Sequence, residues 1–152
     1  MPLNDEKPLD LSVLIRRVVR GTPDQVFKAW TEAEHIQKWW GPAHISCPQC
    51  EMDLRVGGAY RIANLLPDGS TIWIIGRFLK IERPHLLSYS WQSGSSPEHG
   101  DKAQEQVTVR FVSHGDKTEV IVEHRHIADE KTQTSHTNGW TGCLDGIEAY
   151  CS

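Results

Sequence analysis

The sequence predicts an α+β fold with a first strand, two short helices, an antiparallel meander and one long C-terminal helix. A β-branched run near the start is followed at once by two short helical patterns. The middle of the chain, as far as His126, then alternates in strand-like segments, and the C-terminal segment returns to helical period. A length of 152 residues is typical of one domain, so we expect a flexible leader over residues 1–12 and a single domain over residues 13–152.

The first strand and the first helix are defined by their ends. The β-branched run over residues 13–19 predicts a strand that ends at Gly21. Thr22 is then placed as an N-cap, with Pro23 at the first helical position and Gln25 closing a capping box. A helix is therefore expected over the stretch PDQVFKAW.

A second short helix is predicted directly after the first. Thr31 and Glu34 repeat the capping-box pattern, and the Gly-Pro pair at 41–42 is a stop signal. The apolar face of this helix is expected to consist of Ile36, Trp39 and Trp40.

The segment from Cys50 to His126 predicts an antiparallel meander with short turns. In CEMDLRV one face is expected to hold Cys50, Met52, Leu54 and Val56. The glycine pair at 57–58 predicts a bulge or bend, and Gly76 marks a second bend in the long apolar strand TIWIIGRFLKIE. The later strands are expected to point Leu87, Tyr89 and Trp91, then Val107, Val109 and Phe111, then Val120, Val122, His124 and His126 to one face each.

The C-terminal segment has one apolar stripe at helical spacing. It consists of Trp140, Cys143, Leu144, Ile147 and Cys151. Gly139, Gly142 and Gly146 cluster on a neighbouring flank, although each glycine in a helix costs about 1 kcal/mol relative to alanine. The cluster has two interpretations: close packing of the helix on the sheet, or room for a ligand.

Charge and hydropathy exclude several classes of function. A formal charge of -4 and a pI near 6.0, without a basic stripe, predict no nucleic-acid partner. No secretory signal and no apolar run long enough to span a membrane are visible, so we expect a cytoplasmic protein with reduced cysteines.

The expected order of elements is the helix-grip arrangement, and four stretches resemble the START-like (SRPBCC) superfamily. They are VFKAWTEAEHIQKWWGP, EMDLRVGGAYRI, GRFLKIERPHLLSYSW and HTNGWTGCLDGIEAY. From about Val13 to Tyr150 the chain resembles the family named after the C-terminal domain of the activator of Hsp90 ATPase. The resemblance implies a curved antiparallel sheet wrapped around the long C-terminal helix, with a cavity between them. Members of the superfamily bind apolar molecules in this cavity, and a minority catalyse cyclisation or hydrolysis. The activator itself has an additional N-terminal domain, so its co-chaperone role is not expected to follow from the name.

A metal site and a nucleophile were weighed against packing. Cys47 and Cys50, with His124 and His126, could supply a Cys2His2 zinc set. However, the Cys-x-x-Cys pair continues directly into a strand, in which Cys50 is one more inward side chain, so we expect no metal. Cys143 lies on the apolar face of the last helix, where a thiol is normally inert. No Gly-x-Ser-x-Gly elbow or His-Glu-x-x-His helix is present.

We therefore expect a monomer or homodimer that binds an apolar or amphipathic small molecule between sheet and helix, without a cofactor. The residues expected to line the cavity are Trp39, Trp40, Met52, Leu54, Tyr60, Trp73, Tyr89, Trp91, Val109, Val122, His124, Trp140, Cys143 and Ile147. The candidates for orienting the ligand are Arg55, Arg61, His124 and His126. One alternative is an enzyme of polyketide cyclase or hydrolase type, with His124 or a tyrosine as acid or base. Another is a chaperone-linked interaction module, which predicts a filled core and an exposed apolar patch.

Overall fold

A computed structural model describes residues 10–41, 44–98 and 104–152 of the chain. Its elements follow in the order β1 (Leu11–Arg20), α1 (Pro23–Thr31), α2 (Ala33–Trp39), β2 (Cys50–Met52), β3 (Ala59–Leu65), β4 (Thr71–Glu82), β5 (Leu86–Gly94), β6 (Glu105–His114), β7 (Lys117–Ile127) and α3 (Glu130–Cys151). Most of the leader predicted over residues 1–12 lies outside the described residues, as does Pro42, and β1 begins at Leu11. None of the described helices is long and apolar enough to span a membrane.

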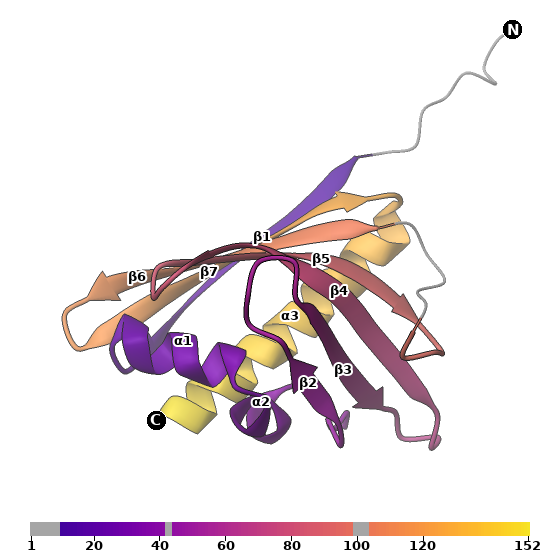
Figure 1. Cartoon of the computed structure of the whole chain (residues 1–152), viewed down its shortest axis with the longest axis horizontal. Coiled ribbons are helices and arrows are strands. Elements are labelled where there is room, and N and C mark those ends of the chain that lie inside the picture. The colour runs from indigo at the N-terminus through magenta and orange to yellow at the C-terminus, as the bar shows by residue number, and fades with distance from the viewer. Residues whose placement is uncertain (1–9, 42–43, 99–103) are drawn as a thin grey trace, which may run out of the picture.

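The described strands form one antiparallel sheet of seven strands in the order β1-β7-β6-β5-β4-β3-β2. Each strand from β2 to β7 pairs with its neighbour in sequence, while β1 pairs with β7. Figure 1 shows the sheet curving over α3, with α1 and α2 near the C-terminal end of that helix. The α+β helix-grip architecture predicted from the sequence is confirmed.

The strand alternation places the core between the sheet and α3. On β6, Val107 and Val109 are 0% exposed, and Val109 pairs across the sheet with the equally buried Val122. The stripe predicted on α3 faces this core: Trp140, Cys143, Leu144 and Ile147 are buried. The Trp140 ring stacks on Trp30 of α1 at 6.0 Å between ring centroids, so helix and sheet share one aromatic core.

The first helix is capped as predicted, but the second is not. Thr22 and Gln25 make both hydrogen bonds of a capping box. Thr31 belongs to α1, where its hydroxyl donates to the carbonyl of Phe27 at 2.8 Å. The N-cap of α2 is Glu32, which has no side-chain capping bond. The predicted Thr31 box is wrong because this hydroxyl bonds back within the last turn of α1.

The strand predicted for CEMDLRV ends early. β2 stops at Met52, and the following residues form a turn in which the amide of Gly58 donates to the carbonyl of Arg55 at 2.8 Å. Val56 is consequently 67% exposed and does not share an inward face with Cys50. An added Cβ at Gly58 would collide with a backbone carbonyl of the same turn, so the glycine pair makes the turn possible.

The alternation of β7 breaks after His124. His124 is 0% exposed, but His126 points to the solvent with φ of 66° and lies 3.3 Å from Asp10. The β1–β7 register shifts at this point, so that Leu11 pairs with the buried Ile127. The predicted inward position of His126 is wrong because this irregularity reverses the parity of the strand.

Candidate functional site

An open pocket of about 640 Å³ lies between the N-terminal half of α3 and the strands β3 to β5. Its apolar side includes Trp40, Ile72, Ile74, Trp91, Trp140 and Cys143. Its polar side includes Glu105, Asp129, Thr132, Ser135, His136 and Asn138. Gly139 also borders the pocket, and an added Cβ there would meet no atom within 4 Å. The pocket therefore has an aromatic side and a hydrogen-bonding side.

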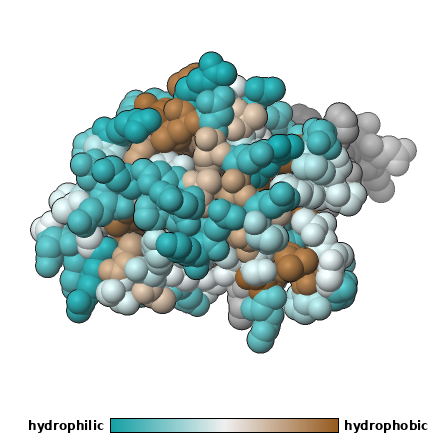
Figure 2. Space-filling view, turned by 60° about the horizontal axis from the view of Figure 1, so that its bottom comes forward, coloured by the Kyte–Doolittle hydropathy of each residue, from teal (hydrophilic) through white to brown (hydrophobic). Residues whose placement is uncertain are grey.

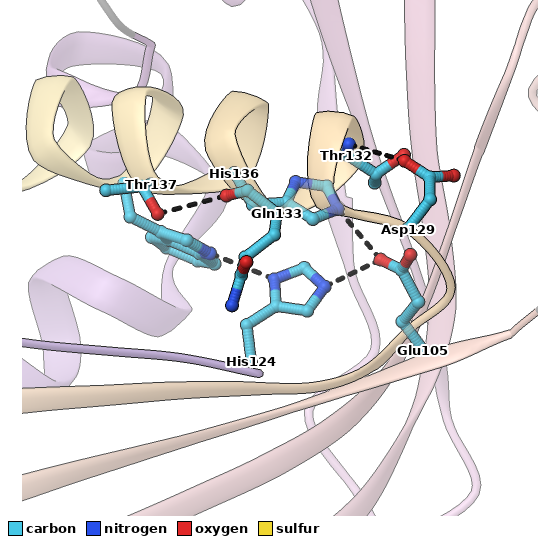
Figure 3. Close-up of polar contacts among 8 residues, drawn as sticks. Glu105, His124, Asp129, Thr132, Gln133, His136 and Thr137 are labelled. Carbon is cyan, nitrogen blue, oxygen red and sulfur yellow. Dashed lines mark hydrogen bonds and ion pairs between the residues drawn. The ribbon is translucent and has the colours of Figure 1, made fainter. Parts of the chain in front are cut away.

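A hydrogen-bonded network forms the polar end of the pocket (Figure 3). Oε1 of Glu105 lies 2.7 Å from Nε2 of His124 and 2.9 Å from Nε2 of His136. On the other side of the His124 ring, the indole N–H of Trp140 donates to Nδ1 at 3.0 Å. The network thus joins β6, β7 and α3 through one carboxylate.

Local sequence rules explain why these side chains meet. Glu105 is the first residue of β6 and has the same parity as the inward-facing Val107. His136 lies one helical turn before Trp140, on the same side of α3. The start of this helix is fixed by Asp129, whose side chain accepts from the amide of Thr132 at 2.7 Å. Both ends of the network are therefore held by regular elements.

The contact with Trp140 fixes the position of the proton on His124. An indole nitrogen can only donate, so Nδ1 of His124 must present its lone pair. The neutral ring then carries its proton on Nε2, which donates to Glu105. Burial lowers the pKa of His124, and this effect outweighs the hydrogen bond to Glu105. His124 is accordingly a neutral donor at pH 7.

Glu105 remains ionised although it is only 8% exposed. Burial by itself would raise the pKa of this carboxyl, but the hydrogen bonds from His124 and His136 reverse the effect and bring the pKa to about 2. The pocket therefore contains a fixed negative charge, which is compensated by imidazole N–H donors.

The same three side chains lie close enough together to be considered as metal ligands. Their ligand atoms all lie within 4.8 Å of one another. However, Nε2 of His124 and Nε2 of His136 both hydrogen-bond to Oε1 of Glu105, at 2.7 and 2.9 Å. Nε2 of His124 also carries the proton that Trp140 dictates. The arrangement suits a carboxylate–imidazole network better than a metal centre.

The Cys2His2 set considered from the sequence is not assembled. In the described part of the chain, Cys47, Cys50, His124 and His126 do not form a metal-binding group. Cys50 pairs with Ile62 in β3, whereas His126 is exposed beside β1.

The structure divides the residues predicted to line the cavity into three groups. Those on the pocket wall are Trp40, Trp91, Trp140 and Cys143. Those in or against the core are Trp39, Met52, Leu54, Tyr60, Tyr89, Val109, Val122 and Ile147. His124 lies behind the wall, bonded to Glu105 and Trp140, and Trp73 lines a separate hollow of about 410 Å³ next to β2.

The middle of the grip is filled. The hollow beside Met52, Tyr60 and Tyr89 has a volume of only about 10 Å³, about enough for one water molecule. The indole N–H of Trp39 donates to the carbonyl of Ala29 at 2.8 Å, whereas that of Trp40 donates to Asn64 at the pocket wall. The open space therefore lies toward the start of α3.

Cys143 shows how burial affects chemistry on this wall. It is only 3% exposed, and burial raises the pKa of its thiol to about 12. A thiol with this pKa is protonated at pH 7, which matches the expectation of inert packing.

Sequence reasoning missed Glu105 and His136, although both had a signal. The inward parity assigned to Val107 and Val109 extends back to Glu105, and the stripe on α3 extends back one turn from Trp140 to His136. Both residues are polar, so a search for apolar periodicity passed over them.

An antiparallel sheet closed on a C-terminal helix, with a pocket between them, defines a protein of the START-like helix-grip class. The chain belongs to the family of activator of Hsp90 ATPase homolog 1-like proteins, whose family model matches residues 20–152. No curated protein matches the sequence.

Several solved structures share the fold. Protein CV1439 from Chromobacterium violaceum is similar with a TM-score of 0.81 and 22% identity, covering 92% of this chain and 96% of that chain. The AHSA1 protein from Silicibacter pomeroyi has a TM-score of 0.81 and 20% identity, with the same coverage. CalU16 from Micromonospora echinospora has a TM-score of 0.70 and 26% identity, covering 93% of this chain and 76% of that chain.

Proposed function

We propose that the protein binds a small molecule with an apolar, flat body and one polar end in the pocket beside the N-terminal half of α3. The observation that carries this proposal is the two-sided lining: tryptophans on one side and the ionised Glu105 with its histidine donors on the other. A volume of about 640 Å³ lies within the range typical of small-molecule sites.

The aromatic side supplies the affinity in this proposal. Trp91 and Trp140 lie 5.5 Å apart between ring centroids, and Trp40 lies edge-on to Trp140 at 5.7 Å. Burial of roughly 200 Å² of ligand surface against these rings would contribute about 5 kcal/mol before the costs of association. The polar end would orient the ligand.

Native mass spectrometry tests the proposal directly. We expect freshly purified protein, or protein incubated with the neutral probe N-phenyl-1-naphthylamine, to carry an extra mass that is lost on denaturation. Gly139→Phe should abolish this binding because its ring would project into the pocket. Ala149→Phe places the same ring at an exposed position of α3 and serves as the matched control. Binding that survives Gly139→Phe would contradict the proposed site.

A second candidate function is proton-transfer catalysis in the same pocket, which His136 favours. Its Nε2 is held by Glu105 at 2.9 Å, as in carboxylate–histidine pairs that act as bases, and its side chain borders the pocket. The groups expected from the sequence are less well placed: both nitrogens of His124 are occupied, and burial raises the pKa of Tyr60 and of Tyr89.

Deuterium exchange at the acidic carbon of 1-phenylbutane-1,3-dione, followed by NMR in D2O, would test this candidate. Catalysed exchange that disappears in His136→Ala and persists in the exposed-site variant His114→Ala would support it. Exchange no faster than in buffer, with the probe bound, would leave the protein a binder.

The surface gives less support to a chaperone-linked interaction module. Among the residues that the structure describes, the exposed large apolar side chains are Leu14 and Val18 on β1, Val56 after β2, Ile72 and Leu79 on β4, and Val112 on β6. On the face shown in Figure 2, hydrophobic groups are small and are separated by hydrophilic ones. The middle of the grip is filled, as this alternative predicts, but the open pocket beside the N-terminal half of α3 is not part of that prediction.

A further inference from the structure

Only one of the two carboxylate oxygens of Glu105 takes part in the hydrogen bonds to the histidines. Both histidines bond to Oε1, and Oε2 accepts no hydrogen bond from any residue that the structure describes. The side chain of Glu105 is 10% exposed and forms part of the pocket wall. An ionised carboxylate oxygen on a pocket wall is a strong acceptor for a hydrogen-bond donor of a ligand.

Trp91, the residue opposite Glu105 in the sheet, has a hydrogen-bond donor without an acceptor among the described residues. Trp91 of β5 pairs directly with Glu105 of β6, so the two side chains are cross-strand neighbours, and Trp91 also borders the pocket. Its indole N–H is buried and has no hydrogen-bond partner within the described chain. A buried donor without a partner lowers the stability of a protein, so it calls for an explanation.

We infer that the ligand is an aromatic hydroxyl compound, a phenol or an enol, whose hydroxyl group binds between Glu105 and Trp91. A hydroxyl is the simplest group that donates and accepts at once: its hydrogen would bond to Oε2 of Glu105, and its oxygen would accept from the indole N–H of Trp91. This inference rests on the proposed function, because it identifies the polar end of the same ligand.

The charge of the pocket favours a neutral hydroxyl compound over an anionic or a cationic ligand. A carboxylate or phosphate would meet the ionised Glu105 and the nearby Asp129, with Lys131 as the cation of the pocket lining. An ammonium group would be attracted to Glu105, but it offers no acceptor to Trp91 and would lose its hydration beside the tryptophan wall. A neutral hydroxyl avoids both costs.

The two histidines strengthen the preference for a donor. Each directs its Nε2 toward Oε1 of Glu105. The N–H groups at these two nitrogens therefore do not donate to the ligand. Since Trp140 keeps His124 neutral, the carboxylate is not neutralised by a buried imidazolium at this position. The polar end therefore presents a strong acceptor.

Four probes of similar shape test the inference by isothermal titration calorimetry at pH 7: 2-naphthol, 2-methoxynaphthalene, 2-naphthoate and naphthalen-2-ylmethylammonium. We expect 2-naphthol to bind about tenfold or more tightly than 2-methoxynaphthalene, because only the hydroxyl donates to the carboxylate. The naphthoate should bind more weakly than both neutral probes. The ammonium probe should bind less tightly than 2-naphthol.

The outcomes separate this inference from the proposed function. Equal binding of 2-naphthol and its methyl ether, or tightest binding of the naphthoate or the ammonium probe, would overturn the hydroxyl assignment while leaving a ligand pocket. No binding by any of the four would count against both the pocket function and the inference.

Variants locate the selectivity on the two residues. Glu105→Gln should remove most of the preference for 2-naphthol over the ether and improve binding of the naphthoate. Trp91→Phe keeps a ring but removes the N–H, so it should weaken 2-naphthol more than naphthalene itself, and it offers a second measurement if Glu105→Gln folds poorly. Glu123→Gln changes a carboxylate of β7 that does not line the pocket, and it should leave all four affinities unchanged. Unchanged selectivity in both pocket variants would refute the assignment.

Discussion

The indole nitrogen of Trp140 lies 3.0 Å from Nδ1 of His124, and it can only donate in this contact. One hydrogen bond between α3 and β7 therefore decides where the proton of a fully buried imidazole resides. The proton therefore lies on Nε2, which donates a hydrogen bond to Oε1 of Glu105, 2.7 Å away, and this carboxylate stays ionised. Trp140 thus fixes which nitrogen of His124 donates to the ionised Glu105.

The tautomer of His124 can be observed directly. We expect long-range 1H–15N correlation spectra to show a neutral His124 ring protonated at Nε2 at pH 7. Because burial lowers the pKa of this ring, a smaller fraction of it should be protonated at pH 6 than of an exposed histidine.

Trp140→Phe tests the cause of this tautomer. Without the indole N–H, Nδ1 of His124 can accept a proton, so we expect the pKa of His124 to rise toward its ordinary value. Trp73→Phe removes an indole outside this network and should leave the His124 signals unchanged. A ring protonated at Nδ1 in the native protein would show that the hydrogen-bond assignment is wrong.

Glu105 should make the protein sensitive to acid. Its folded pKa of about 2 lies below its ordinary value of 4.5, so the unfolded chain takes up the proton first as the pH falls. The stabilisation is therefore complete above pH 4.5 and is lost on the way down to about pH 2, with a magnitude of up to about 3 kcal/mol. Urea unfolding of the native protein and of Glu105→Gln at several pH values measures this. We expect the variant to lose less stability than the native protein over that interval, and equal pH slopes would contradict the assignment.

Two glycines of α3 should respond in opposite ways to alanine. An added Cβ at Gly139 meets nothing, so Gly139→Ala should stabilise the protein by about 0.5–1 kcal/mol through helix propensity. At Gly146 the added carbon would overlap the backbone carbonyl of Trp39, so Gly146→Ala should destabilise it by about 1–3 kcal/mol. Chemical denaturation of the two variants checks both signs, and a stabilising Gly146→Ala would contradict the close packing.

The fold was predictable because each element has a local signal. The capping box at Thr22, the alternation around Val109 and the stripe through Leu144 each reflect short-range geometry. Where prediction failed, a non-local contact decided the outcome. The shifted β1–β7 register turns His126 outward, and no pattern within β7 alone contains that information.

The pocket was harder to place than the fold. Aromatic residues were expected to line it, but Tyr60 and Tyr89 pack edge to face in the core, with ring centroids 5.1 Å apart. The neighbouring Trp39 and Trp40 point in different directions: the indole of Trp39 donates to Ala29, and that of Trp40 donates to Asn64 at the pocket wall. Composition reveals how much aromatic surface a chain has, but not which rings meet one another. Of the helix glycines, Gly146 packs closely against the backbone of Trp39, whereas Gly139 faces open space.

The geometry of the network also predicts a weak response to metals. Zinc would need Nε2 of His124 without its proton, whereas the hydrogen bond from Trp140 to Nδ1 keeps that proton on Nε2. We expect Co2+ titration to give no absorption bands of a site that contains Glu105, and Zn2+ to leave the thermal midpoint within about one degree. Any binding that appears should be lost in a Cys47→Ser, Cys50→Ser double variant, because those thiols are the softer ligands. Binding that instead disappears in His136→Ala would show that the network rearranges around a metal, and the proton assignment on His124 would then have to be abandoned.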